Sequence, residues 1–189
     1  MLRPMFVVVA LLLCTGGGMA QERDDDPIRL FESRVAAYVA LHRSIEGLLP
    51  APQLFTDYHA AHKVFAAMSE TMRTARADAA EGDIFADMAL EFGRRITDGL
   101  QAAQLDPTDL LAEMQDTTES GARPPVVNET FSWALGNLMP PSLLMRLPPL
   151  PDELQFRLVG PDLVLIDIHA DLVVDVLRNV LPEPSARPF

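Results

Sequence analysis

The sequence predicts an α+β protein, mainly α: a small antiparallel helical bundle followed by a C-terminal three-stranded antiparallel β-meander packed on it. Apolar residues recur at three- and four-residue spacing through residues 27–116, which is the period of amphipathic helices. Three short apolar segments separated by turn residues occupy residues 152–181. Because a three-stranded meander needs cover for its apolar face, we expect residues 21–189 to form one domain.

Residues 1–20 are predicted to be a secretory signal peptide. A basic residue precedes an apolar run over residues 5–13, and small residues fit a signal peptidase site between Ala20 and Gln21. That run is too short to span a membrane. A lipoprotein signal at Cys14 is the alternative, although the residue before that cysteine is larger than usual. We expect an exported bacterial protein, periplasmic or extracellular, whose mature chain has no cysteine and no transmembrane anchor.

The composition argues against some classes of partner. The 189-residue chain has a formal net charge of −12, whereas nucleic-acid binding needs a basic surface that neutralises phosphates. Anionic membranes likewise attract basic segments. We therefore expect no nucleic-acid partner, and instead an unknown protein or envelope partner.

Start signals place the predicted helices between residues 27 and 116. Asp26–Pro27 and Asp106–Pro107 each combine an N-cap carboxylate with a proline at the first helical position. A second helix is expected from Thr56–Asp57, and a third from Asp83, which can cap it. The apolar stripe of the first helix runs through Phe31, Val35, Tyr38, His42, Ile45 and Leu49.

Residues 117–151 are expected to form a loop and a proline-rich connector. One short helical turn is predicted after Met139, and the segment 147–151 is expected to be extended, because each proline restricts the residue before it. Residues 182–189 contain three prolines and are expected to be a frayed tail.

Two-residue loops at Gly160–Pro161 and His169–Ala170 set the predicted strand register. The expected pairs are Leu158–Leu163, Phe156–Leu165, Leu165–Val174 and Leu163–Val176. The resulting apolar face consists of Leu154, Phe156, Leu158, Leu163, Leu165, Leu172, Val174 and Val176. On the other, polar face, Arg157 and Asp175 are expected to form a structural ion pair.

Several motifs carry a resemblance that extends over most of the mature chain. They are Phe31, Arg34–Val35, Tyr38–Val39, Leu41–Arg43 and Glu46, then Gly82–Phe85, then Leu147–Pro151, Val159–Gly160, Asp162–Leu163, Asp167 and Val174–Asp175. These residues resemble an uncharacterised family of exported bacterial proteins, and the resemblance implies no activity. The strand–turn–strand ending is also similar to the tails of small periplasmic proteins of the RcnB type, which are linked to nickel and cobalt handling. The helical half has no counterpart there, so metal handling does not carry over.

The group Asp167, His169 and Asp171 is the strongest chemical cluster. On a continuing strand these alternate residues point the same way and offer two carboxylates and an imidazole to a metal. The alternative is a tight turn with a solvated histidine at its tip. A second candidate lies at the start of the second helix and consists of Asp57, His59 and His62. Its alternative is a set of exposed side chains, because a cationic histidine is disfavoured near a helix N-terminus.

His42 lies on the apolar face of the first predicted helix, with Glu46 one turn later. It is either a buried general base held by Glu46 or a core histidine bonded to a carboxylate or to the backbone. No nucleophile can be placed beside it, and no catalytic constellation is found elsewhere. We therefore expect a non-enzymatic binding or structural component of the cell envelope, with no catalytic residue and no cofactor. A periplasmic metal-binding or metal-sensing protein is the alternative.

Overall fold

The fold is α+β and mainly helical, which confirms the predicted class. A computed structural model describes residues 26–50, 58–135 and 137–181. The helices are α1 (Pro27–Glu46), α2 (Tyr58–Ala75), the 3-10 helix η1 (Ala86–Met88), α3 (Ala89–Ala103), α4 (Pro107–Thr117) and α5 (Pro141–Leu144). The strands are β1 (Asn137–Leu138), β2 (Leu154–Val159), β3 (Asp162–Asp167) and β4 (Leu172–Leu177), in the order β1-β2-β3-β4 within one antiparallel sheet. The predicted signal peptide, Cys14, the Ala20–Gln21 cleavage site and the tail at 182–189 lie outside the described residues.

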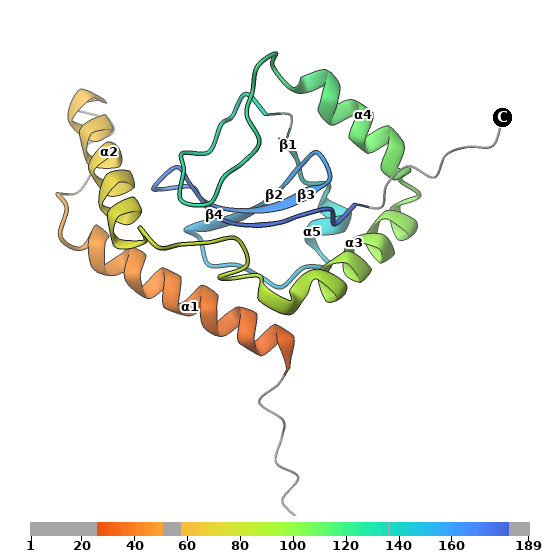
Figure 1. Ribbon diagram of the computed structural model, residues 1–189, viewed down its shortest axis with the longest axis horizontal. Helices are drawn as coiled ribbons and strands as arrows, with labels where there is room; N and C mark the ends of the chain where they lie inside the picture. Colours follow the sequence, from red (N-terminus) through yellow and green to blue (C-terminus); the bar gives the residue numbers. More distant parts are fainter. Residues whose placement is uncertain (1–25, 51–57, 136, 182–189) are drawn as a thin grey trace, which may run out of the picture.

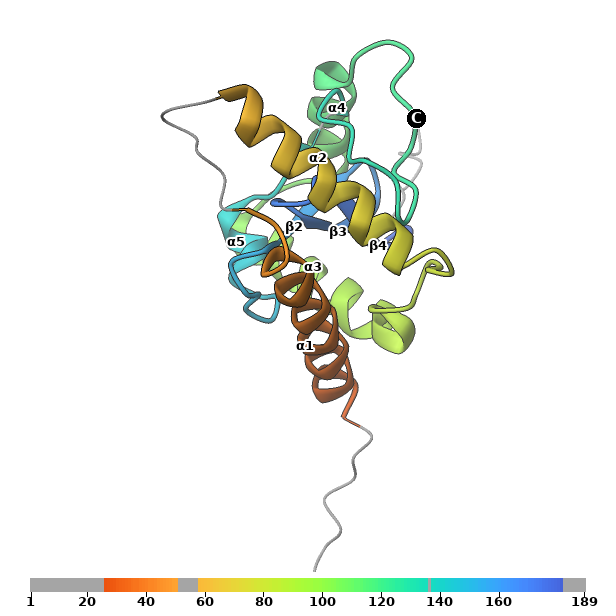
Figure 2. The same cartoon turned by 90° about the vertical axis from the view of Figure 1, so that its left-hand side faces the viewer.

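The helices lie around the sheet (Figure 1). Helices α1 and α3 pass on one side of it, while the chain between α4 and β1 runs on the opposite side. Helix α2 lies oblique to α1, which it contacts (Figure 2). Within the described part of the chain, no helix is both long enough and apolar enough to cross a membrane.

Two of the predicted helix starts are confirmed by their caps. The Ile28 N–H donates to Asp26 Oδ1, and the Thr108 N–H donates to Asp106 Oδ1. The third predicted start is wrong, because helical structure begins at Ala86 and not after Asp83. The backbone N–H groups of the loop that contains Asp83 donate instead to the distant carboxylate of Asp175.

The β2–β3 hairpin has the predicted register. Leu158 lies opposite Leu163 and Phe156 lies opposite Leu165. The two-residue turn places Gly160 at a φ of +56°, a left-handed conformation that glycine adopts without steric cost.

The β3–β4 pairing follows the predicted register only near its turn. Ile166 pairs with Val173, but a β-bulge between Leu165 and Ile166 then shifts the strands by one residue. Leu165 therefore lies opposite Asp175, and the predicted Leu165–Val174 pair is wrong. Leu163 likewise pairs with Leu177 and not with Val176, which packs on the other face of the sheet. Such a bulge turns side chains of one strand to a new direction.

The predicted pair between Arg157 and Asp175 is also wrong. Arg157 donates to Gln155 Oε1, whereas Asp175 is fully buried against the loop that precedes η1. The bulge explains this outcome, because it lets Asp175 face the helices and not the expected polar side of the sheet.

The helix-side core joins the helices to one face of the sheet. Four phenylalanine rings meet in it, with ring centroids 5.2–6.4 Å apart. They are Phe31 of α1, Phe85 just before η1, Phe92 of α3 and Phe156 of β2. Aromatic pairs at such distances add to the stability gained from burial. Leu147 of the proline-rich segment is buried in the same core.

The connector-side core covers the opposite face of the sheet, which the sequence had suggested to be polar. Three connector residues, Val127, Phe131 and Leu135, pack against Val159, Val164, Ile166, Val173 and Val176. The meander is thus buried on both faces, as a run of apolar residues such as those of β3 indicates.

Two glycines of α3 are expected to respond in opposite ways to replacement by alanine. A Cβ at Gly99 would lie 2.7 Å from Leu143 Cδ2 and 3.3 Å from the Ser142 carbonyl oxygen, where α3 meets α5. Leu143 is fully buried, so Gly99→Ala should lower the free energy of unfolding by about 1–3 kcal/mol. A Cβ at Gly93 would meet nothing within 4 Å, so Gly93→Ala should raise it by about 0.5–1 kcal/mol. Urea unfolding of both variants tests the expectation, which fails if both changes have the same sign.

Candidate functional site

A buried network of polar side chains links α1 to the end of β3. His42 and Asp167 are both fully buried, and His42 Nδ1 lies 2.6 Å from Asp167 Oδ2. The same oxygen accepts a hydrogen bond of 2.7 Å from the Tyr38 hydroxyl. Asp167 Oδ1 accepts the backbone N–H groups of His169 and Ala170, at 3.0 and 2.8 Å. The carboxylate therefore holds both α1 and the turn that follows β3.

The second ring nitrogen of His42 is the unusual feature of this network. Because Nδ1 faces a carboxylate acceptor, it carries the proton in the neutral ring, which leaves a lone pair on Nε2. His42 Nε2 is buried and has no hydrogen-bond partner among the described residues. Five other buried side-chain atoms among the described residues also lack a partner, so what distinguishes this nitrogen is the nearness of two further ligand side chains to His42.

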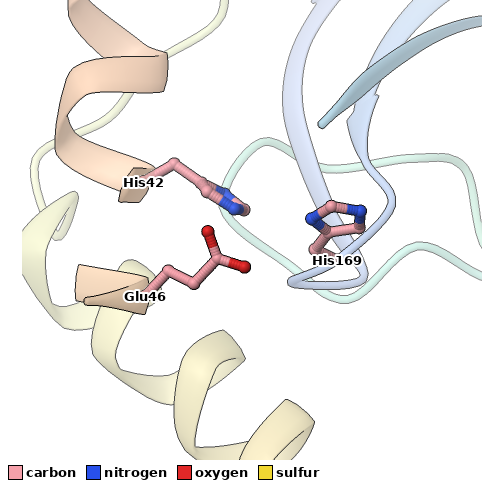
Figure 3. Close-up of side chains that lie close together, drawn as sticks. All are labelled: His42, Glu46 and His169. Carbon is pink, nitrogen blue, oxygen red and sulfur yellow. The ribbon is translucent and has the colours of Figure 1, made fainter. Parts of the chain in front are cut away.

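Glu46 and His169 approach His42 from the exposed side. The three residues offer ligand atoms that all lie within 4.8 Å of one another, and Glu46 and His169 are both exposed. Figure 3 shows the Glu46 carboxylate directed toward the space between the two imidazole rings. The ring centroids of His42 and His169 are 5.6 Å apart. We call this set, His42, Glu46 and His169, the two-histidine group.

Without a metal ion, the buried pair favours its charged form, in which His42 Nε2 also carries a proton that a bound ion would displace. Burial lowers the pKa of His42, but the hydrogen bond and charge of Asp167, with smaller contributions from Glu46 and Glu153, outweigh it and raise the pKa. Burial likewise raises the pKa of Asp167, and the hydrogen bonds from His42, Ala170 and Tyr38 outweigh that effect and lower it. Burial and the charge of Asp167 raise the pKa of the Tyr38 phenol, which therefore remains a donor.

The structure separates the three residues that the sequence grouped as metal candidates. β3 ends at Asp167, and residues 168–171 form a turn, so the continuing strand on which the grouping depended is not present. His169 joins the two-histidine group, while Asp167 supports His42 with both oxygens already hydrogen-bonded. Asp171 lies outside the group and accepts the indole N–H of Trp133.

The prediction of a core histidine bonded to a carboxylate is confirmed for His42, and the partner is Asp167. The sequence did not identify Glu46 and His42 as joint ligands, although their spacing of one helical turn is a usable signal. Nothing in the sequence brings His169 to them, because it lies at the other end of the chain. Of the second candidate group, Asp57 lies outside the described residues, His59 is part of α2, and His62 is exposed and outside the two-histidine group.

No protein family, no curated protein and no solved structure matches this chain. The chemistry of the two-histidine group therefore carries the functional argument.

The buried pair predicts a pH window for stability. The folded pKa of Asp167 lies below its ordinary value of 3.8, so its stabilising contribution is complete above that value and is lost as the pH falls through the folded pKa. The folded pKa of His42 lies above 6.5, so its contribution is complete below that value and is lost as the pH rises through the folded pKa. Metal-free protein should therefore gain most from this pair between about pH 4 and about pH 6.5.

Urea unfolding of metal-free protein across this range measures the effect. His62→Gln, which changes an exposed histidine, should leave the pH dependence of stability unchanged. His42→Gln should remove the loss of stability above about pH 6.5. A stability of the parent protein that climbs steadily from about pH 5 to about pH 8 would contradict the assignment.

Proposed function

We propose that this chain is an exported, non-enzymatic protein that binds a divalent transition-metal ion through His42 Nε2, Glu46 and His169. The observation that carries the proposal is the buried Nε2 of His42, which has no partner among the described residues, on a side chain whose ligand atom lies within 4.8 Å of those of the exposed Glu46 and His169. The export of the protein rests on the signal-peptide pattern in residues 1–20.

The arrangement around His42 supports a metal ligand. Histidines that bind metals usually donate their other ring N–H to a carboxylate, which fixes the tautomer and the ring orientation. Asp167 occupies that position, at 2.6 Å from Nδ1. A tetrahedral ion with bonds of about 2.0–2.2 Å needs ligand atoms about 3.4 Å apart. Since the atoms lie within 4.8 Å, small movements of the exposed Glu46 and His169 side chains would close the site.

The ligand types indicate the class of ion. Two imidazoles with one carboxylate suit Zn²⁺, Cu²⁺, Ni²⁺ and Co²⁺, whereas Ca²⁺ and Mg²⁺ prefer oxygen ligands alone. A role for His42 as a general base that activates a nucleophile would instead require that nucleophile to be hydrogen-bonded to Nε2. Within the described residues that nitrogen bonds to none, which supports binding over catalysis. An envelope partner, expected from the sequence, is compatible with this function and remains a prediction.

Calorimetric titration of the full chain, without a histidine tag, tests the proposal. One equivalent of Zn²⁺, Ni²⁺, Co²⁺ or Cu²⁺ should bind. His169→Asn and Glu46→Gln change exposed side chains, and each should weaken binding by at least the roughly 10–100-fold that loss of an outer-shell partner costs, because each removes one of three direct ligands. His62→Asn, at an exposed histidine outside the group, should leave affinity unchanged.

The variant Asp171→Asn distinguishes the proposed site from the group Asp167, His169 and Asp171 that the sequence suggested. Asp171 lies in the same turn as His169 but outside the two-histidine group, so its replacement should not alter affinity. The proposal fails if no ion binds, or if Asp171→Asn abolishes binding while Glu46→Gln has no effect.

A further inference from the structure

The proposed site contains one fixed ligand and two movable ones. His42 is fully buried, and its ring is held by Asp167, which is itself held by Tyr38 and by two backbone N–H groups. The position of Nε2 is therefore set by the fold. Glu46 is the last residue of α1, and His169 lies in the turn between β3 and β4.

The described contacts of the two movable ligands leave their side chains free to rotate, and the ring that His169 contacts is that of His42 itself. Both side chains are exposed, and neither makes a hydrogen bond or an ion pair with another described residue. Exposed side chains of this kind change rotamer freely, so they can follow the geometry that a bound ion prefers. The site thus fixes where an ion binds but does not impose a tetrahedral, square-planar or octahedral arrangement.

Selection among similar ions depends on such imposed geometry. A site that does not impose it ranks divalent ions by their intrinsic affinity, in the order Mn²⁺ < Fe²⁺ < Co²⁺ < Ni²⁺ < Cu²⁺ > Zn²⁺. Imidazole nitrogen and carboxylate oxygen are also ligands that Cu²⁺ accepts in its tetragonal geometry. The three ligands are two imidazoles and a carboxylate, and a cysteine thiolate, which would favour Cu⁺, is not among them.

We propose that Cu²⁺ is the ion this site binds most tightly, through His42, Glu46 and His169, with water in the remaining equatorial position. Water completes the site because, in the part of the chain that the structure describes, no fourth histidine, cysteine, aspartate or glutamate joins the group. This inference rests on the proposed metal-binding function and names the ion that the site prefers.

Competition between ions tests the preference. The untagged full chain loaded with Zn²⁺, or with Ni²⁺, is titrated with Cu²⁺ in a chelator buffer that sets the free concentration of each ion. Cu²⁺ should displace both, with an affinity higher by roughly tenfold or more. The electron paramagnetic resonance spectrum should show two coupled imidazole nitrogens, and His169→Asn should reduce them to one. Glu46→Gln should weaken Cu²⁺ binding while both nitrogens remain coupled.

The possible results separate the two proposals. Tighter binding of Zn²⁺ or Ni²⁺ than of Cu²⁺ would overturn the copper preference and leave metal binding at this site intact. Copper whose nitrogen coupling is unchanged in His169→Asn would place that ion elsewhere and would also overturn the preference. Absence of binding by every ion would overturn the proposed function itself. Because His169 and Glu46 are exposed, these variants are expected to fold, which circular dichroism checks.

Discussion

Replacing Asp167 by Asn is expected to lower the free energy of unfolding by about 3 kcal/mol. The carboxylate accepts four hydrogen bonds in a fully buried position, two on each oxygen. An asparagine keeps the shape of the side chain, but it removes the charge that pairs with His42, and its NH₂ group cannot accept, so Tyr38 and His42 would have to change from donors to acceptors at that position. Urea unfolding at about pH 6, where the pair with His42 contributes fully, measures the loss.

The matched control is Asp171→Asn in the same turn. Asp171 is incompletely buried, and its described side-chain contact is with the exposed Trp133. Its φ of +53° is a conformation that asparagine tolerates well. This variant should change stability by less than about 0.5 kcal/mol. Equal effects of the two changes would show that the buried network does not hold α1 to β3.

Replacing Asp175 by Asn is the second change with a large expected effect, a loss of about 2–3 kcal/mol. The fully buried carboxylate accepts the N–H groups of Gly82, Ile84 and Phe85, together with that of Val176. These bonds of 2.7–2.8 Å fix the loop that carries Phe85 into the helix-side core. The amide of asparagine would again direct N–H groups at backbone donors.

Asp83→Asn provides the control for this second change. Asp83 belongs to the same loop but is exposed, and its carboxylate accepts a backbone N–H from Ala80. Asparagine can accept that bond as well, so the expected loss is below about 0.5 kcal/mol. Hydrogen exchange of the Ile84 and Phe85 amides measures the loss of these bonds directly. Unchanged protection of both amides in Asp175→Asn would contradict the conclusion that Asp175 fixes this loop.

Local signals predicted the parts of the fold that depend on neighbouring residues. The Asp-Pro starts of α1 and α4 are confirmed because an N-cap and its first-turn N–H lie two residues apart. The β2–β3 register is confirmed because Gly160 and the alternation of apolar residues fix it within one hairpin.

The remaining features depend on contacts between distant residues. The bulge in the β3–β4 pairing accompanies the bonds of Asp175 to a loop about 90 residues earlier in the chain. The prediction that the third helix starts at Asp83 is wrong for the same reason, because the N–H groups of that loop bond to the distant Asp175. At the candidate site, the sequence shows the spacing of His42 and Glu46, but the bond from His42 to Asp167 spans 125 residues. No local pattern reports a pairing over such a separation.

The connector between α4 and α5 pairs with both edges of the β2–β4 meander. At one edge, residues 128–131 form backbone hydrogen bonds with β4, including Asn128 N–H to Val173 O and Val173 N–H to Glu129 O. At the other edge, β1 pairs with β2. Unpaired strand edges are templates for aggregation. Since one segment pairs with part of both edge strands, proteolytic cleavage within it should free parts of two edges at once and increase the self-association of the chain.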